Sequence, residues 1–240
     1  MNRDDKQTID SVETELRKRE LDLAALHTQI NSHFFYNVLA SIRGIANLGS
    51  KELLSEIIEK TVRYLKYSSA INNESDLYNE IRYLELYIDI HRILSNRAIN
   101  MNINCPDDLM SASMQKFLLQ PIVENIVNHS VSASQEYTCI DITVKRCADD
   151  IIMVIRDNGK GIAPARLAEI RSIIYAGFTD REKPKTAGVG MYNIQQRLRL
   201  YYGKKYRLRI FSKEGEGTSV YLPFPYKKRR MDVDSLNDRN

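Results

Sequence analysis

The feature that most constrains the fold is a change in the spacing of apolar residues at about residue 97. Before that point apolar side chains recur every three or four residues, as they do along one face of a helix. From there on Ile99, Met101 and Ile103 alternate with asparagines, which is the two-residue period of a strand. We therefore predict an α+β protein, helical in its first part and with helices packed on one face of a sheet in its second.

The helical part is predicted to contain three helices. Apolar residues in the first helix follow alternating three- and four-residue steps: Ile9, Val12, Leu16, Leu23, Leu26 and Ile30. This spacing is typical of a coiled coil, although a single amphipathic helix on a globular body gives the same pattern. The helix should continue through 29–42, and Gly44 and Gly49 indicate a turn before helices over 51–71 and 77–95. These helices would form half of a four-helix bundle, completed by a second copy of the chain.

Strand and helix patterns then follow one another to the end of the chain. We predict helices over 113–131, 165–176 and 189–202, and strands over 99–105, 138–146, 151–156, 206–212 and 218–223. The resulting organisation is a coiled-coil segment (1–28), a helical dimerisation segment (29–96), a mixed domain (97–226) and a basic tail (227–240).

Composition excludes several classes of protein. The net charge of +4 is small and the basic residues are scattered, so a nucleic-acid partner is not expected. The basic run 227–230 is interpreted as a solvated tail, with a membrane or nucleic-acid contact as the alternative. Cys105, Cys139 and Cys147 lack metal-ligand spacing and suit a reducing compartment, which indicates a cytoplasmic location. No apolar run reaches the ~18 residues of a membrane span, so we expect any membrane link to depend on a segment outside this sequence.

Asp157 directly follows an apolar strand and precedes Gly159 and Gly161. A carboxylate at a strand end can accept a hydrogen bond from a buried amine such as that of adenine, and glycines let the backbone approach a ligand. The alternative is a plain strand-to-helix turn, because D-N-G is common in turns. Gly188 and Gly190 open a later helix, whose free N–H groups and dipole favour a phosphate. They do not follow a strand, and no P-loop lysine accompanies them.

A third candidate is the helix containing Gln120, Glu124, Asn125 and Asn128. Oxygen atoms on one helix face suit Mg²⁺, which prefers hard ligands, although a solvated face gives the same pattern. The fourth candidate is His33, because a neutral imidazole is a competent nucleophile near neutral pH. Most histidines on helices are structural or merely exposed, which is the alternative for His33.

Taken in order, five segments resemble the motifs of the LytS-like (YehU-like) branch of bacterial sensor histidine kinases. The nucleotide-binding part of that family has the Bergerat-type fold shared with gyrase and MutL. The segments are LHTQINSHFFYNVLASI (26–42), LLQPIVENIVNH (118–129), DNGKGI (157–162), AGVGMYNIQQRL (187–198) and GEGTSVYLPFP (215–225). Five matches in this order are far more specific than any one of them.

This resemblance implies an enzyme that uses Mg-ATP to phosphorylate its own His33, with Asn37 and Glu124 in the catalytic set. It implies that ATP and Mg²⁺ are held by Asn125 (the metal ligand), Asn128, His129, Asp157, Gly159, Gly161, Gly188, Gly190, Met191, Asn193 and Thr218. It also implies a homodimer, with segment 29–96 serving histidine phosphotransfer. The phosphoryl group would pass to an aspartate on the receiver domain of a response regulator.

Several positions depart from the family pattern. Ser32 stands in place of the usual proline before the acceptor, and Asn128 stands where a lysine is frequent. Phe35, Ala40 and Ile126 are further departures. Two alternatives therefore stay open: a dimeric scaffold that binds nucleotide without transferring phosphate, and an ATPase or kinase acting on another chain through Glu124.

Overall fold

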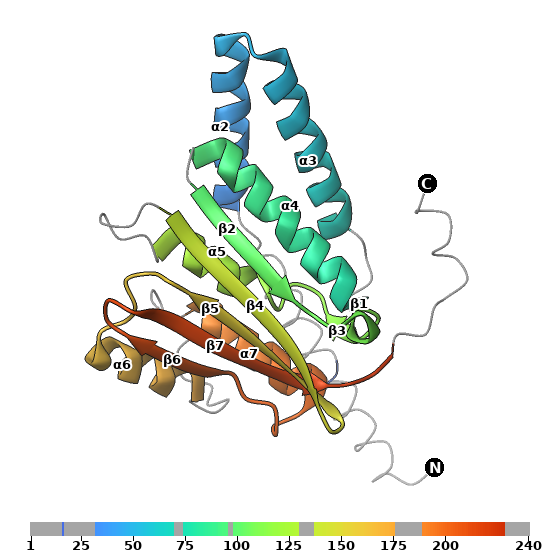
Figure 1. Cartoon of the computed structure of the whole chain (residues 1–240), viewed down its shortest axis with the longest axis vertical. Coiled ribbons are helices and arrows are strands. Elements are labelled where there is room, and N and C mark those ends of the chain that lie inside the picture. The colour runs from blue at the N-terminus through green and yellow to red at the C-terminus, as the bar shows by residue number, and fades with distance from the viewer. Residues whose placement is uncertain are drawn as a thin grey trace, which may run out of the picture. The chain divides into compact units, whose positions relative to one another are not determined.

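The computed structural model describes residue 16 and residues 32–69, 74–95, 98–129, 137–175 and 189–228. The chain divides into two compact units, 1–49 and 50–240, and Figure 1 shows the elements of each. Apart from the helical, exposed Leu16, the predicted coiled coil lies outside the described residues. None of the helices in the described part of the chain is long and apolar enough to cross a membrane.

In the first unit, helix α2 (Ser32–Leu48) confirms the predicted helix over its described part. Gly44 does not break it, which corrects the sequence prediction. A single glycine costs a helix only about 1 kcal/mol. The helix ends instead at Gly49, whose φ of 75° suits glycine and whose N–H donates to the carbonyl of Ala46 (3.1 Å). Phe34 and Val38, four residues apart, are buried on one face of the helix.

The second unit begins with two helices, α3 (Lys51–Ser69) and α4 (Leu77–Ser95), as predicted. Helix α4 starts where it does because Oδ1 of Asp76 accepts a hydrogen bond from the N–H of Asn79 (2.8 Å), which caps the helix. The two helices pack through stacked aromatic rings, with the centroids of Tyr64 and Tyr83 4.4 Å apart. A short strand between them, β1 (Glu74–Asp76), pairs antiparallel with β3 (Ser113–Gln115).

The main sheet has five strands in the order β2-β4-β5-β7-β6. Their bounds are β2 (Ala98–Asn104), β4 (Tyr137–Cys147), β5 (Asp150–Asp157), β6 (Arg209–Lys213) and β7 (Gly217–Pro225). Strands β2 and β4 run parallel, and the other pairs are antiparallel. All five were predicted from the sequence, the first of them from its two-residue period, although β6 begins three residues later than expected. A single 3-10 turn, η1 (Asp107–Leu109), follows β2.

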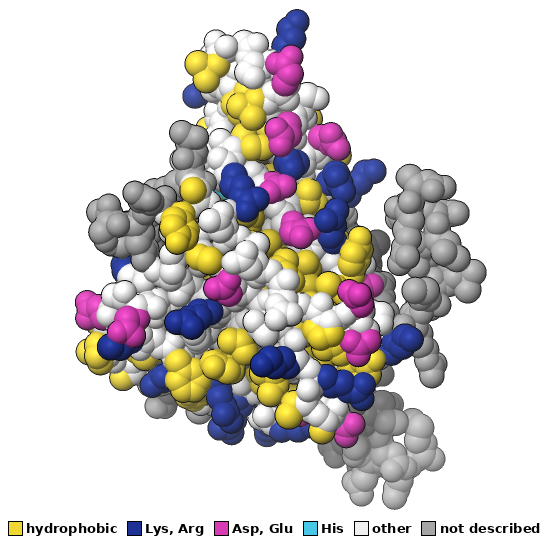
Figure 2. Space-filling model, in the orientation of Figure 1, with side chains coloured by type: hydrophobic (Ala, Val, Ile, Leu, Met, Phe, Trp, Pro, Cys, Tyr) yellow, Lys and Arg dark blue, Asp and Glu magenta, His cyan; other side chains and the backbone are white. Residues whose placement is uncertain are grey.

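Three helices cover one face of this sheet: α5 (Gln120–His129), α6 (Pro164–Tyr175) and α7 (Val189–Tyr202). They lie behind the sheet in Figure 1. Alternate strand residues such as Ile142, Ile155 and Leu222 are buried beneath them, whereas Phe211 and Tyr221 on the other face are exposed. Figure 2 shows hydrophobic and basic side chains mixed on that face. The predicted α+β class, with helices on one side of the sheet, is confirmed.

One predicted helix was wrong at its start. We expected a helix over 113–131, but its first residues form strand β3 and a turn, and α5 begins only at Gln120. The turn contains Phe117 with a φ of 58°, in the left-handed region, which ends any regular helix there. Pro121 then occupies the first turn of α5, where its missing N–H costs nothing.

Candidate functional site

The period of strand β5 directs Asp157 toward the helices. Ile151, Met153, Ile155 and Asp157 are all buried on the face that the helices cover, and Asp157 is only 5% exposed. Its Oδ1 accepts a hydrogen bond from the N–H of Gly159 (2.7 Å), which folds the glycine-containing loop back onto the carboxylate. The structure therefore places a buried carboxylate at the end of a strand, as the sequence predicted.

Two glycines allow the β6–β7 hairpin to pack tightly against this loop. Gly217 has a φ of 93°, and a Cβ there would lie 2.1 Å from the carbonyl oxygen of Asp157. Gly161 has a φ of 68°, and a Cβ there would lie 2.0 Å from the carbonyl oxygen of Lys213. Neither site can hold a larger residue without moving the backbone. Gly161 therefore has a packing role, and its predicted contact with a ligand stays a prediction.

Asn158 fixes the same loop to strand β4. Its N–H donates to the carbonyl of Cys139 (3.3 Å), and its Oδ1 accepts from the N–H of Cys139 (2.7 Å). Its Nδ2 also donates to the carbonyl of Tyr137 (3.3 Å). The sequence indicated only a turn here, and the asparagine in D-N-G was the signal for this anchor.

Thr218 lies on the hairpin side of the loop. Its hydroxyl bonds the hydroxyl of Ser212 (2.9 Å), and that Ser212 oxygen also accepts from the N–H of Ile162 (2.9 Å). Thr218 thus helps to hold β7 and the loop together. Its predicted contact with a nucleotide stays a prediction.

The structure brings together helices α5 and α7, which the sequence singled out separately. A Cβ at Gly190 would lie 3.2 Å from Nδ2 of Asn125, so the two residues are in close contact. Nδ2 of Asn125 also donates to the carbonyl of Pro121 (2.7 Å). Met191 and Asn193 follow Gly190 in the first turns of α7, both half-buried. The predicted metal ligand therefore lies against the predicted phosphate-binding helix start.

The other polar residues of α5 do not form the single polar side that was expected. Gln120 is 2% exposed, and its Nε2 donates to the hydroxyl of Tyr64 on α3 (2.7 Å). Glu124, one turn later, is half-buried and lies near Tyr64. The pKa of Tyr64 is raised mainly by its burial and, to a smaller extent, by the charge of Glu124. Residues four apart share a helix face, so Gln120 and Glu124 face α3 whereas Asn125 faces α7. Asn128 is exposed.

The remaining predicted residues belong to the first unit or fall outside the described part of the chain. His33 is in the first turn of α2, with its side chain outside the described atoms, and Asn37 lies one turn later and is exposed. Gly188 and the side chain of His129 also lie outside the described part of the chain.

A buried ionic cluster, not predicted from the sequence, surrounds the turn before α5. Glu80 on α4 is 1% exposed and accepts hydrogen bonds from the hydroxyl of Tyr67 (2.6 Å) and the N–H of Phe117 (3.0 Å). Arg197 on α7 is 4% exposed; it donates to the carbonyls of Phe117 (2.9 Å) and Lys116. Burial raises the pKa of Glu80 to about 7 and lowers the pKa of Arg197. One feature of the sequence could have indicated this cluster. An ionisable residue lies beside a buried apolar one on each helix, Glu80 next to Ile81 and Arg197 next to Leu198.

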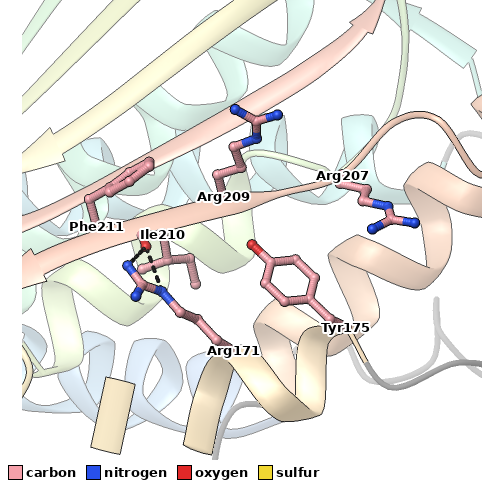
Figure 3. A pocket seen from close by; sticks show the side chains of 6 residues that line it. All are labelled: Arg171, Tyr175, Arg207, Arg209, Ile210 and Phe211. Atoms are coloured by element: carbon pink, nitrogen blue, oxygen red, sulfur yellow. Dashed lines mark hydrogen bonds between the residues drawn. The ribbon is translucent and has the colours of Figure 1, made fainter. Parts of the chain in front are cut away.

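A separate surface cavity of about 340 Å³ lies beside the edge strand β6. Its lining residues, shown in Figure 3, are Arg171, Tyr175, Arg207, Arg209, Ile210 and Phe211. Arg171 donates from Nε and Nη2 to the carbonyl of Ile210 (3.1 and 2.6 Å), and the hydroxyl of Tyr175 donates to the carbonyl of Leu208 (2.9 Å). These side chains cover the edge of the sheet. Because the three guanidinium groups point in different directions, they do not form a converging anion site.

Comparison with known proteins gives matches to two family models. Residues 21–99 match the model described as Histidine kinase, and residues 114–228 match the model described as Histidine kinase-, DNA gyrase B-, and HSP90-like ATPase. The chain is 28% identical over 229 residues to Sensor protein kinase HptS of Staphylococcus aureus (strains USA300 and NCTC 8325), covering 95% of this chain and 43% of HptS. Together the two models cover most of the chain, and both descriptions name histidine kinases. The chain spans less than half the length of these curated relatives.

Solved structures of histidine kinases also align with this chain. The histidine kinase domain of a blue-light activated kinase from Erythrobacter litoralis EL346 is 15% identical, with a TM-score of 0.42, covering 88% of this chain and 96% of that one. The mycobacterial sensor histidine kinase MprB is 15% identical, with a TM-score of 0.44, covering 66% of this chain and 100% of that one. The ATPase family match spans Asn125, Asp157 and Gly190. The LytS-like branch stays a prediction.

Proposed function

We propose that this kinase binds Mg-ATP on the helix-covered side of its sheet and phosphorylates its own His33. The observation that carries the proposal is the contact between Asn125 and Gly190, on the sheet face to which β5 directs the buried Asp157. The phosphoryl group then passes to an aspartate on the receiver domain of a response regulator. This assignment agrees with the LytS-like branch and with a cytoplasmic kinase region.

The residues present fit the chemistry of this ligand. The amide oxygen of Asn125 is a hard donor of the kind Mg²⁺ takes, and the bound ion would neutralise charge on the phosphates. The first N–H groups of α7, around Gly190, and the positive end of its dipole favour phosphate oxygens. The carboxylate of Asp157 can accept a hydrogen bond from the amino group of adenine. Each of the three parts of the nucleotide complex therefore has a matching group.

The transfer step makes one bond and breaks one. A lone pair on a ring nitrogen of His33 attacks the γ-phosphorus, the N–P bond forms as the bond to the β–γ bridging oxygen breaks, and ADP leaves. Because imidazole has an ordinary pKa of ~6.5, the neutral ring with its free lone pair is available near neutral pH. The chain contributes positioning of the reacting atoms and of the groups that hold the phosphates.

A transfer assay with γ-³²P-labelled ATP tests the assignment. The wild type should become labelled, His33→Gln should not, and Asp157→Asn should lose both nucleotide binding and label. The label should be lost in acid, because a phosphoramidate is acid-labile whereas a phosphoserine ester is not. Equal labelling of the wild type and His33→Gln would contradict the acceptor assignment. Phosphate release without any label would instead favour an ATPase that uses Glu124.

We also propose that the kinase forms a homodimer through its helical segment. Helix α3 exposes Ile58, Val62 and Leu65 by 43%, 46% and 41%, and their spacing of four and three residues places them on one face. An exposed apolar stripe on a helix is typical of a helix that packs against another. A second copy of α3 supplies a matching stripe, as in a four-helix bundle.

A further inference from the structure

The turn before α5 is held from two sides by ionisable side chains of other helices. Glu80 of α4 accepts from the N–H of Phe117, and Arg197 of α7 donates to the carbonyl of Phe117. We call this set of three residues the Phe117 clamp. The N–H and the carbonyl of this one residue are thus both bonded to buried side chains, and the bond from the Arg197 guanidinium is charge-assisted.

The clamp acts on a residue in an uncommon conformation. Phe117 has a φ of 58°, which residues other than glycine rarely adopt, and it is only 5% exposed. Such a conformation persists when the surroundings fix it. Around Glu80 lie Tyr67 from α3, Lys116 from the turn and Arg197 from α7, and Nζ of Lys116 donates to the carbonyl of Tyr67 (3.3 Å). The surroundings that fix Phe117 therefore come from α3, α4 and α7.

The position of Phe117 determines where α5 starts. The N–H groups of Ile122 and Val123 donate to the carbonyl of Leu119 (3.0 and 3.1 Å), so the helix begins at Gln120, three residues after Phe117. Asn125, in the next turn, contacts Gly190 at the start of α7. Arg197 lies on that same helix α7. Arg197 thus links α7 to the turn before α5, and the contact between Asn125 and Gly190 links α7 to α5 itself.

We propose that Glu80 is a positioning residue of the nucleotide site. With Arg197 it fixes Phe117, and through Phe117 it sets the distance between Asn125 and the start of α7. Since Glu80 and its partner Tyr67 belong to α4 and α3, a change in the packing of these two helices changes nucleotide affinity. The effect on affinity rests on the proposed nucleotide binding, whereas the clamp itself does not.

Nucleotide affinity of Glu80 variants tests the proposal. Glu80→Leu removes both acceptors, and the Kd for a fluorescent Mg-ATP analogue should rise about tenfold, which corresponds to ~1.4 kcal/mol. Glu80→Gln keeps an acceptor for the N–H of Phe117 and should stay within about threefold of the wild type. The shorter aspartate side chain in Glu80→Asp cannot reach both Tyr67 and Phe117. This milder variant tests the same contacts if Glu80→Leu does not fold.

The control is Ile90→Ala, a buried residue near the other end of α4. It should lower the melting temperature without changing the Kd of the folded protein. Nucleotide binding by Glu80→Leu and Glu80→Asp equal to that of the wild type, or an equal loss of affinity in Ile90→Ala, would refute the positioning role.

Amide hydrogen exchange separates this proposal from the proposed function. In the protein without nucleotide, exchange at Phe117 and in the first turn of α5 should become at least about tenfold faster in Glu80→Leu, with strands β4 and β5 unchanged. If the wild type binds no Mg-ATP, the proposed function fails while the exchange result still decides whether the clamp exists. Unchanged exchange at Phe117 would refute the clamp, whatever the nucleotide result.

Discussion

Replacing Glu80 by glutamine should change how the free energy of unfolding depends on pH. Burial is the main cause that raises the pKa of this carboxyl to about 7 from an ordinary 4.5, and it outweighs the opposing effects of Tyr67, Phe117, Arg197 and Lys116. Each unit of pKa difference between the folded and unfolded chain corresponds to about 1.4 kcal/mol. The Glu80 carboxyl should therefore contribute up to roughly 3 kcal/mol to the pH dependence of stability.

The sign follows from the protons bound in each state. Between pH 4.5 and about 7 the folded chain keeps a proton on Glu80 that the unfolded chain releases. The contribution to stability is therefore complete below pH 4.5 and is lost as the pH rises through about 7. Since glutamine does not titrate, the stability of the wild type relative to Glu80→Gln should fall by up to roughly 3 kcal/mol across that range.

Urea denaturation of both proteins at several pH values, followed by circular dichroism, measures this difference. The two proteins share every other titrating group, so subtracting one curve from the other isolates Glu80. A difference that does not change with pH would refute the reasoning. A difference that grows with pH would show that Arg197 and Lys116 keep Glu80 ionised in the folded chain.

Three further substitutions test other parts of the structure. Gly217→Ala should lower the free energy of unfolding, measured by thermal unfolding, by roughly 2 kcal/mol more than Gly215→Ala does. Both glycines have a positive φ (93° and 81°), but only at Gly217 would a Cβ meet backbone at 2.1 Å; at Gly215 nothing in the described chain lies within 4 Å. Asn158→Ala should cost about 1–3 kcal/mol, also by thermal unfolding, because it leaves polar backbone groups of β4 without partners. Val62→Glu should give a monomer in sedimentation velocity where the wild type gives a dimer, since it puts a charge in the apolar stripe of α3. A dimer that persists in this variant would contradict the proposed interface.

Much of the fold could be predicted because the signals are local. The limits of α4 and α7 were predicted to the residue, since each has a helical apolar period and a breaker at its ends. The place of Asp157 at the end of an apolar strand was also predicted from the sequence. The start of α5 could not be predicted in this way, because strand β3 exists only through its pairing with β1, about forty residues earlier.

The candidate site likewise has a part that could be predicted from the sequence and a part that depends on packing between distant segments. The sequence supplied Asn125, Asp157 and Gly190 as candidates, because their residue types and their neighbours suit nucleotide chemistry. It gave no indication that Gln120 turns toward Tyr64, since that depends on which helix packs beside α5. The clamp on Phe117 was equally hidden, because Glu80 and Arg197 lie far from it in the sequence.

By itself, the amino-acid sequence determined most of the helices and strands, the place of Asp157 at the end of β5 and the order of the nucleotide-binding motifs. These depend on spacing and residue type, which a chain carries before it folds. Tertiary structure alone decided which polar residues of α5 face α7 and which face the tyrosines of α3. It also decided that two buried ionisable groups hold the backbone of Phe117. These features depend on contacts between distant segments, because what a helical side chain contacts is decided by the elements that pack beside the helix.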